Sequence, residues 1–123
     1  MKIYTSYFAR IKSFPPNVVP IAVCGKSPQW YRGAQYKTLA PKYGFFMKWK
    51  ETRDDEYYIR CFKEQVTDCL TQSAVFEELS LLSNGNDVAL VCYEKPSDFC
   101  HRHLIAAWLR EAGHDVSELE YKS

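Results

Sequence analysis

Five residues with chemically reactive side chains lie in one short stretch near the C-terminal end of the chain: Cys92, Glu94, Cys100, His101 and Arg102. The apolar run at residues 88–91 predicts a buried strand that ends beside the first of them, and helical spacing begins near the last. In open α/β folds, ligands bind where parallel strands end and the following helices begin. We therefore expect these five side chains to converge and to form a candidate catalytic site.

The residue types in this cluster fit three interpretations. In the first, Cys92 or Cys100 is a nucleophilic or redox thiol that is stabilised at the helix start, with His101 as base and Arg102 as anion clamp. In the second, the two cysteines bind zinc or iron together with His101 or Glu94, although their spacing matches no tight zinc-finger pattern. In the third, Glu94 pairs with Arg102 and the cysteines fill core space. The pattern favours a functional role but identifies no reaction and no cofactor.

Charge is distributed unevenly along a chain whose net charge is only +1. Residues 1–50 contain nine Lys or Arg and no acidic residue, so all fifteen acidic residues lie in the rest of the chain. This division indicates an anionic partner, unless the acidic helices fold over the basic segment and neutralise it. We predict that the cluster of Cys92, Glu94, Cys100, His101 and Arg102 binds or acts on a small phosphate- or nucleotide-like anion at the sheet edge. The further ligand-binding residues that we predict are Cys24, Lys26, Trp30 and Arg32. Nucleic acid is the alternative partner, because aromatic and basic residues alternate between residues 26 and 50.

The length of 123 residues suits a single domain over residues 1–123. No apolar run is long enough to span a membrane, and the N-terminal residues lack the pattern of a signal peptide. We therefore expect a cytoplasmic protein without a membrane partner, in which the five cysteines are mostly reduced thiols.

Hydrophobic patterning predicts strands and helices in the order β, β, helices, β, α, β. The expected strands cover residues 2–8, 18–24, 88–93 and 115–120, and the expected helices cover residues 43–50, 52–66 and 72–82. A last helix should start at a cap, Ser97 or Asp98, and end at Gly113. Residues 29–42 should form a long ordered loop. This order predicts a small three-layer α/β sandwich with a mainly parallel sheet of about four strands.

The C-terminal motif resembles the domain of unknown function 488 family of bacteria, archaea and phages. That family has Cys-x-Glu at a strand end and Cys-His-Arg at the start of its last helix, which correspond here to Cys92, Glu94, Cys100, His101 and Arg102. The segments KIYTSYF and VVPIAVCGKSPQWYRG are also similar to the family's first two strands and the loop that follows them. The resemblance implies an α/β fold with a polar site and no established reaction. Many members carry Arg directly after the second strand, where this chain has Cys24 and Gly25, followed by Lys26.

Overall fold

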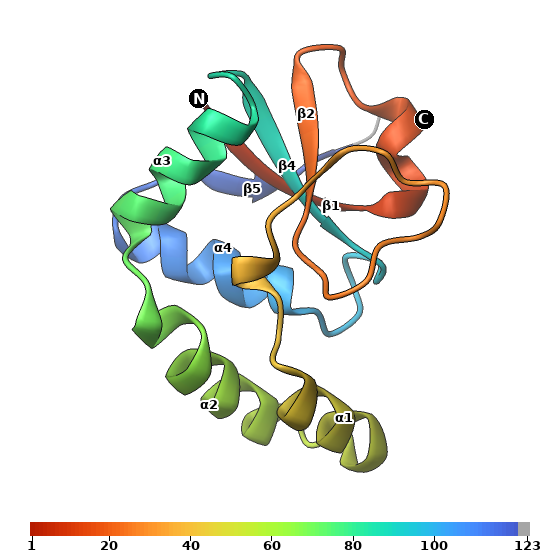
Figure 1. Cartoon of the computed structure of the whole chain (residues 1–123), viewed down its shortest axis with the longest axis vertical. Helices are drawn as coiled ribbons and strands as arrows, with labels where there is room; N and C mark the ends of the chain where they lie inside the picture. The colour runs from red at the N-terminus through yellow and green to blue at the C-terminus, as the bar shows by residue number, and fades with distance from the viewer. Residues whose placement is uncertain (121–123) are drawn as a thin grey trace.

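The computed structural model describes residues 1–120, which form a five-stranded parallel sheet flanked by helices (Figure 1). The strand order is β3-β2-β4-β1-β5. In chain order the strands are β1 (Ile3–Tyr7), β2 (Val18–Ala22), β3 (Ala34–Gln35), β4 (Asp87–Cys92) and β5 (Val116–Glu118). The central strand β4 pairs with β1 on one side and β2 on the other, so its last residue lies in the middle of the carboxyl edge.

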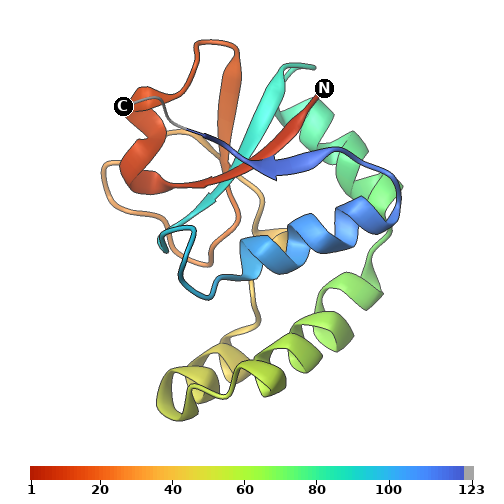
Figure 2. The ribbon, with the colours of Figure 1, turned by 180° about the vertical axis from the view of Figure 1, so that it is seen from behind.

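Four α-helices cover one face of the sheet in two layers (Figures 1 and 2). They are α1 (Tyr43–Thr52), α2 (Asp55–Gln65), α3 (Gln72–Leu82) and α4 (His101–Glu111). Helices α3 and α4 lie against the sheet, whereas α1 and α2 form an outer layer beyond α4. The short 3-10 helices are η1 (Phe8–Ser13), η2 (Lys37–Leu39) and η3 (Thr67–Cys69). Within residues 1–120, the opposite face of the sheet is covered by η1, the loop after β2 and Leu119.

The alternation of side chains along β4 divides the core between the two faces. Val88 and Leu90 pack toward the helices, and Ala89 and Val91 pack toward η1 and the loop after β2. All four are fully buried, as expected for a central strand of a parallel sheet with both faces covered. This burial fixes the place where β4 ends and therefore the place where the reactive motif begins.

The expected α/β fold with a parallel sheet is confirmed, with differences in its elements. The sheet has five strands because β3 adds a two-residue strand within the segment that was expected to be a loop. Neither Ser97 nor Asp98 caps α4, since its N-cap residue is Cys100, which makes no side-chain capping bond. The helix therefore starts later than expected, directly at the reactive residues. No helix within residues 1–120 is both long enough and apolar enough to cross a membrane.

The burial of β4 predicts that two leucine substitutions change the free energy of unfolding by very different amounts. Leu90 is completely buried in β4, so Leu90→Ala leaves a cavity and should lower the free energy of unfolding by about 2–5 kcal/mol. Leu81 on α3 is 72% exposed, and Leu81→Ala should change stability by no more than about 0.5 kcal/mol. Urea unfolding of both variants measures the difference, and equal effects would contradict the placement of β4 at the centre of the core.

Candidate functional site

The end of β4 and the start of α4 bring the two cysteines of the motif together. Cys92 is the last residue of β4 and Cys100 is the N-cap residue of α4, and both are buried. The structure joins them by a disulfide, with their Cα atoms 7.7 Å apart. The expectation of mostly reduced cysteines therefore needs correction for this pair, because the strand–loop–helix connection brings the two sulfur atoms into contact. The other three, Cys24, Cys61 and Cys69, are free thiols.

His101 points its ring at the same two sulfur atoms. Its Nε2 lies 2.7 Å from the carbonyl oxygen of Val23, which can only accept a hydrogen bond, so Nε2 carries the proton and Nδ1 keeps its lone pair. Nδ1 lies 3.8 Å from the Sγ atom of Cys100. Together, Cys92, Cys100 and His101 place one ligand atom each within 4.8 Å of one another. The expected convergence of thiols and imidazole is therefore present.

Burial also decides the charge of His101. It lowers the pKa of His101 to about 4, opposed by the hydrogen bond to the Val23 carbonyl and assisted by the nearby Arg102 guanidinium. The ring is therefore neutral at physiological pH. A group with this pKa is a weak base toward a thiol whose ordinary pKa is about 8.5. The arrangement suits a neutral imidazole that offers a lone pair better than one that removes a thiol proton.

Arg102 is completely buried, and its guanidinium forms hydrogen bonds with several parts of the motif from the protein interior. Its Nη1 atom donates to the Cys92 sulfur at 3.1 Å and to the backbone carbonyl of Glu94. Its Nε and Nη2 atoms donate to the carboxylate of Glu118 on β5 at 3.3 and 3.1 Å. The carboxylate partner of Arg102 is thus Glu118 and not Glu94. With all three nitrogens engaged inside the protein, Arg102 acts here as a structural cation.

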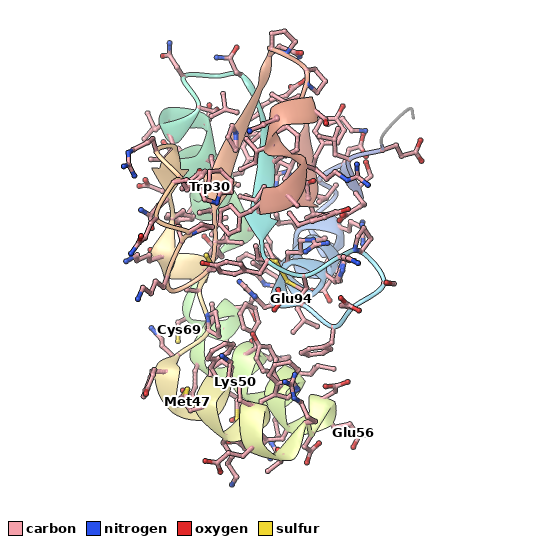
Figure 3. All side chains as sticks on the ribbon, turned by 90° about the vertical axis from the view of Figure 1, so that its right-hand side faces the viewer. Trp30, Met47, Lys50, Glu56, Cys69 and Glu94 are labelled. Atoms are coloured by element: carbon pink, nitrogen blue, oxygen red, sulfur yellow. A yellow bond between two sulfur atoms is a disulfide. The ribbon has the colours of Figure 1, made fainter. Side chains whose placement is uncertain are left out.

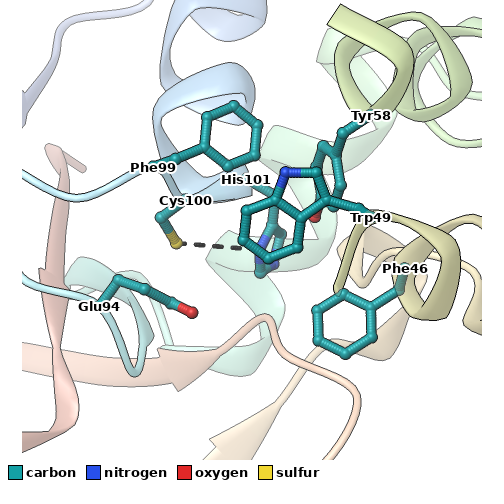
Figure 4. Close-up of a pocket in the computed structure, with 7 residues that line it drawn as sticks. All are labelled: Phe46, Trp49, Tyr58, Glu94, Phe99, Cys100 and His101. Atoms are coloured by element: carbon teal, nitrogen blue, oxygen red, sulfur yellow. Dashed lines mark hydrogen bonds between the residues drawn. The ribbon is translucent and has the colours of Figure 1, made fainter. Parts of the chain in front are cut away.

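A small pocket opens onto this cluster, and Figure 4 shows its walls. It has a volume of about 20 Å³, which is enough for one water molecule, since that requires roughly 10–15 Å³. The polar lining residues are Glu94, Cys100 and His101. The aromatic walls come from α1, α2 and the loop before α4, and consist of Phe46, Trp49, Tyr58 and Phe99.

The polar part of the pocket lining consists of a carboxyl group, a sulfur atom and an imidazole. Glu94 contributes the carboxyl group and Cys100 the sulfur atom, and none of the Lys and Arg residues within 1–120 lines the pocket. Burial raises the pKa of Tyr58, whose phenol therefore stays neutral. The sequence does not predict this aromatic lining, because the contact of these four rings with the motif depends on the packing of α1 and α2.

Residues 7–113 of the chain match a family model described as "Active DUF488-N3 subclade". The chain belongs to this family. Neither a curated protein nor a solved structure matches it. The DUF488-like motif that indicated this family, from Cys92 to Arg102, lies within the matched residues and is also where the buried cluster forms.

The predicted ligand-binding residues of this DUF488-N3 chain lie beside the pocket and do not line it. The Cys24 thiol donates to the carbonyl of Lys26 at 3.5 Å, and burial raises the pKa of this thiol. Lys26, Trp30 and Arg32 are exposed on the loop after β2. Figure 3 shows Trp30 on the sheet half of the molecule and Glu94 where that half meets the α1–α2 layer. Any ligand of this loop would therefore lie outside the cluster of Cys92, Cys100 and His101.

The low pKa of His101 predicts how stability depends on pH. In the unfolded chain the ring has a pKa near 6.5, so below this value the unfolded state binds the proton more readily than the folded state. The stability that the neutral ring contributes is complete above pH 6.5 and is lost as the pH falls toward 4. His101→Gln keeps a donor for the Val23 carbonyl but cannot titrate in this range.

Between about pH 7 and pH 4.5, the disulfide-bonded, chelator-treated parent protein should lose about 2–3 kcal/mol more unfolding free energy than His101→Gln. Denaturant titrations at the two pH values measure the loss. If the parent and the variant lose the same amount, the His101 ring is not the neutral, buried group that the structure shows.

Proposed function

We propose that the reduced protein is a metal-binding protein whose centre is formed by Cys92, Cys100 and His101. The observation that carries the proposal is the meeting of three buried ligand atoms within 4.8 Å of one another. Thiolate and imidazole ligands suit zinc, and also iron. Zinc is the ion we expect first, because two thiolates and an imidazole are frequent ligands in its tetrahedral sites.

The distance between the Cys100 sulfur and the His101 ring is close to the one that zinc requires. With Zn–S of about 2.3 Å and Zn–N of about 2.0–2.1 Å, a sulfur and a nitrogen ligand lie roughly 3.6 Å apart in a tetrahedral site. The Cys100 sulfur and Nδ1 of His101 are separated by 3.8 Å. The 7.7 Å between the two cysteine Cα atoms is wider than the roughly 4.4–6.8 Å usual for a disulfide. This width supports the proposal, since in the dithiol form it leaves space for an ion between the sulfurs.

The hydrogen bonds around the cluster also suit metal ligands. A ligating histidine usually donates its second ring N–H to a carboxylate or a backbone carbonyl, which orients the ring. The bond from His101 to the Val23 carbonyl has this form. The guanidinium of Arg102, which donates to the Cys92 sulfur, favours the thiolate that a metal needs.

The pocket supports a centre with an exchangeable fourth position. Three protein ligands with a water in the fourth place are typical of catalytic zinc sites, whereas structural sites have four protein ligands. The pocket beside Cys100 and His101 has room for one water, with the Glu94 side chain at its wall. Such a centre lowers the pKa of its bound water and polarises a substrate oxygen. Metal-assisted hydrolysis is the reaction class that these features support best.

Elemental analysis of untagged protein, purified under reducing conditions, tests the centre. We expect about one equivalent of zinc per chain after zinc loading and removal of excess metal. Cys92→Ser, Cys100→Ser and His101→Gln should each lose most of this zinc. Cys61→Ser is the matched control, because Cys61 is a buried thiol on α2 that belongs to no ligand cluster among residues 1–120. Less than roughly a tenth of an equivalent in the parent protein would contradict the proposal.

A second candidate function, the binding of a nucleotide-like anion, is favoured by an aromatic platform on the other face of the sheet. The platform consists of Phe8, Trp30 and Tyr93. The Phe8 ring lies 6.1 Å from the Trp30 ring and 5.0 Å from the Tyr93 ring, edge to face. Trp30 and Tyr93 are 57% and 51% exposed. Aromatic rings with this exposure can stack on nucleobases.

Basic residues on the two segments that carry the platform match an anionic ligand. Arg10 and Lys12 are exposed on η1, and Lys26 and Arg32 are exposed on the loop after β2. No acidic residue occurs in either segment. The Tyr93 hydroxyl donates to the carbonyl of Lys26 at 2.6 Å, which ties this loop to the residues that follow Cys92. The platform is thereby held next to the proposed metal centre.

Fluorescence anisotropy with a labelled oligothymidylate tests the platform, and competition with unlabelled mononucleotides separates a nucleotide ligand from a nucleic-acid strand. Trp30→Ala should weaken binding by about 5- to 160-fold, since stacking contributes about 1–3 kcal/mol per base. Tyr43→Ala is the control, because Tyr43 is 76% exposed on α1, outside the platform. Absence of binding to either ligand at low salt, or equal binding by Trp30→Ala and the parent, would contradict this candidate.

A further inference from the structure

The disulfide of this structure joins two of the three residues that we propose as metal ligands. A thiolate ligand holds a metal through a charged lone pair, which a disulfide sulfur no longer provides. The same two atoms therefore cannot form the bridge and hold the ion at the same time. Whether the site can bind a metal ion therefore depends on the oxidation state of Cys92 and Cys100.

We infer that the Cys92–Cys100 pair is a redox switch that releases the metal when it is oxidised, with Cys100 as the thiolate that reacts first. This inference rests on the proposed metal centre and adds its regulation. A hydroperoxide is the oxidant class that we assign to the switch, since the pocket admits a molecule about as small as water. The structure, in which the two cysteines are bridged, corresponds to the oxidised form of this pair.

Access to solvent assigns different roles to the two cysteines. Cys100 lines the pocket, whereas Cys92 does not line it and is only 1% exposed. A peroxide that enters the pocket therefore meets Cys100 first. Cys92 lies behind it, where Nη1 of Arg102 donates to its sulfur and favours the thiolate form that can attack the oxidised partner.

The reaction proceeds in two balanced steps. The Cys100 thiolate attacks one oxygen of hydrogen peroxide, the O–O bond breaks, and hydroxide leaves, which gives the sulfenic acid directly. The Cys92 thiolate then attacks the Cys100 sulfur, the S–S bond forms, and the S–O bond breaks with loss of a second hydroxide. Two thiolates, one peroxide and two protons thus give one disulfide and two waters. The metal loses two anionic ligands and leaves, and a dithiol reductant reverses the change.

The three free cysteines lie outside the cluster, so we do not expect them to form a disulfide with Cys92 or Cys100. The Cys24 thiol is directed at the Lys26 carbonyl and lies 3.9 Å from the Ser27 hydroxyl, so it is outside the cluster. Cys61 is buried on α2. Cys69 is exposed and would react with peroxide by itself, so the experiment uses a Cys69→Ser background.

Zinc release and thiol loss, measured together, test the switch. Reduced Cys69→Ser protein is first loaded with zinc and then titrated with hydrogen peroxide in the presence of a chromogenic zinc chelator. We expect one zinc to be released for every two thiols lost, with the new bridge located between Cys92 and Cys100 by mass spectrometry. A dithiol reductant should restore both the thiols and zinc binding. Cys61→Ser, added to this background, should behave identically.

The order of the two cysteines is tested by trapping the sulfenic acid with dimedone. In Cys92→Ser the sulfenic acid should accumulate at Cys100 and be labelled, since its partner is missing. In Cys100→Ser, Cys92 should remain largely unlabelled at the same peroxide dose. Labelling of Cys92 in preference to Cys100 would overturn the assigned order.

Two outcomes separate this inference from the proposed function on which it rests. If the reduced protein takes up no zinc at the start, the metal centre itself is wrong, and the switch fails with it. If zinc is taken up but stays bound after the Cys92–Cys100 bridge has formed, or if peroxide forms no bridge, the metal centre stands and only the switch is overturned.

Discussion

The buried guanidinium of Arg102 is the constraint on which the site depends. A completely buried charge costs several kcal/mol in lost hydration unless close partners offset the loss. Arg102 finds those partners in three places: the Cys92 sulfur at the end of β4, the Glu94 carbonyl in the loop, and the Glu118 carboxylate on β5. Because one side chain must satisfy all three, the end of β4, the loop and the start of α4 have little freedom to move independently. The contacts of Arg102 therefore also fix the positions of the two cysteines and His101.

This use of Arg102 changes the charge that the pocket presents to a ligand. An arginine that faced the pocket would attract phosphate or carboxylate, as its position at a helix start suggests. Here the positive charge lies behind the sulfur atoms and is neutralised by Glu118, while Glu94 faces the pocket. The guanidinium therefore lies on the protein side of the sulfur atoms, where it would stabilise the thiolates of the proposed metal centre. The exposed basic residues that could attract an anion lie instead around the aromatic platform.

The sequence reveals the convergence of the motif because the relevant contacts are local. In a parallel sheet, a strand, a short loop and a helix start necessarily lie close together, so Cys92, Cys100 and His101 could be placed from their positions alone. The family assignment follows from the same stretch. By contrast, the role of Arg102 depends on Glu118, which reaches it only because β5 pairs with β1. The two-residue strand β3 carries too few residues to show a period, and its pairing with β2 is likewise a tertiary effect.

The aromatic walls of the pocket could not be inferred either, since Trp49 and Tyr58 show ordinary core spacing on their helices. Their position over His101 arises because α1 and α2 pack outside α4 and bring a continuous set of rings to the sheet edge. Phe99 lies 5.3 Å from the Trp49 ring and 5.0 Å from the Tyr58 ring, so the loop before α4 closes against this outer layer. The layer excludes bulk water from the sulfur atoms, which strengthens the electrostatic interactions between them, His101 and Arg102. It also leaves a pocket of only about 20 Å³ beside Cys100, so the outermost helices limit the size of any molecule that can reach this sulfur.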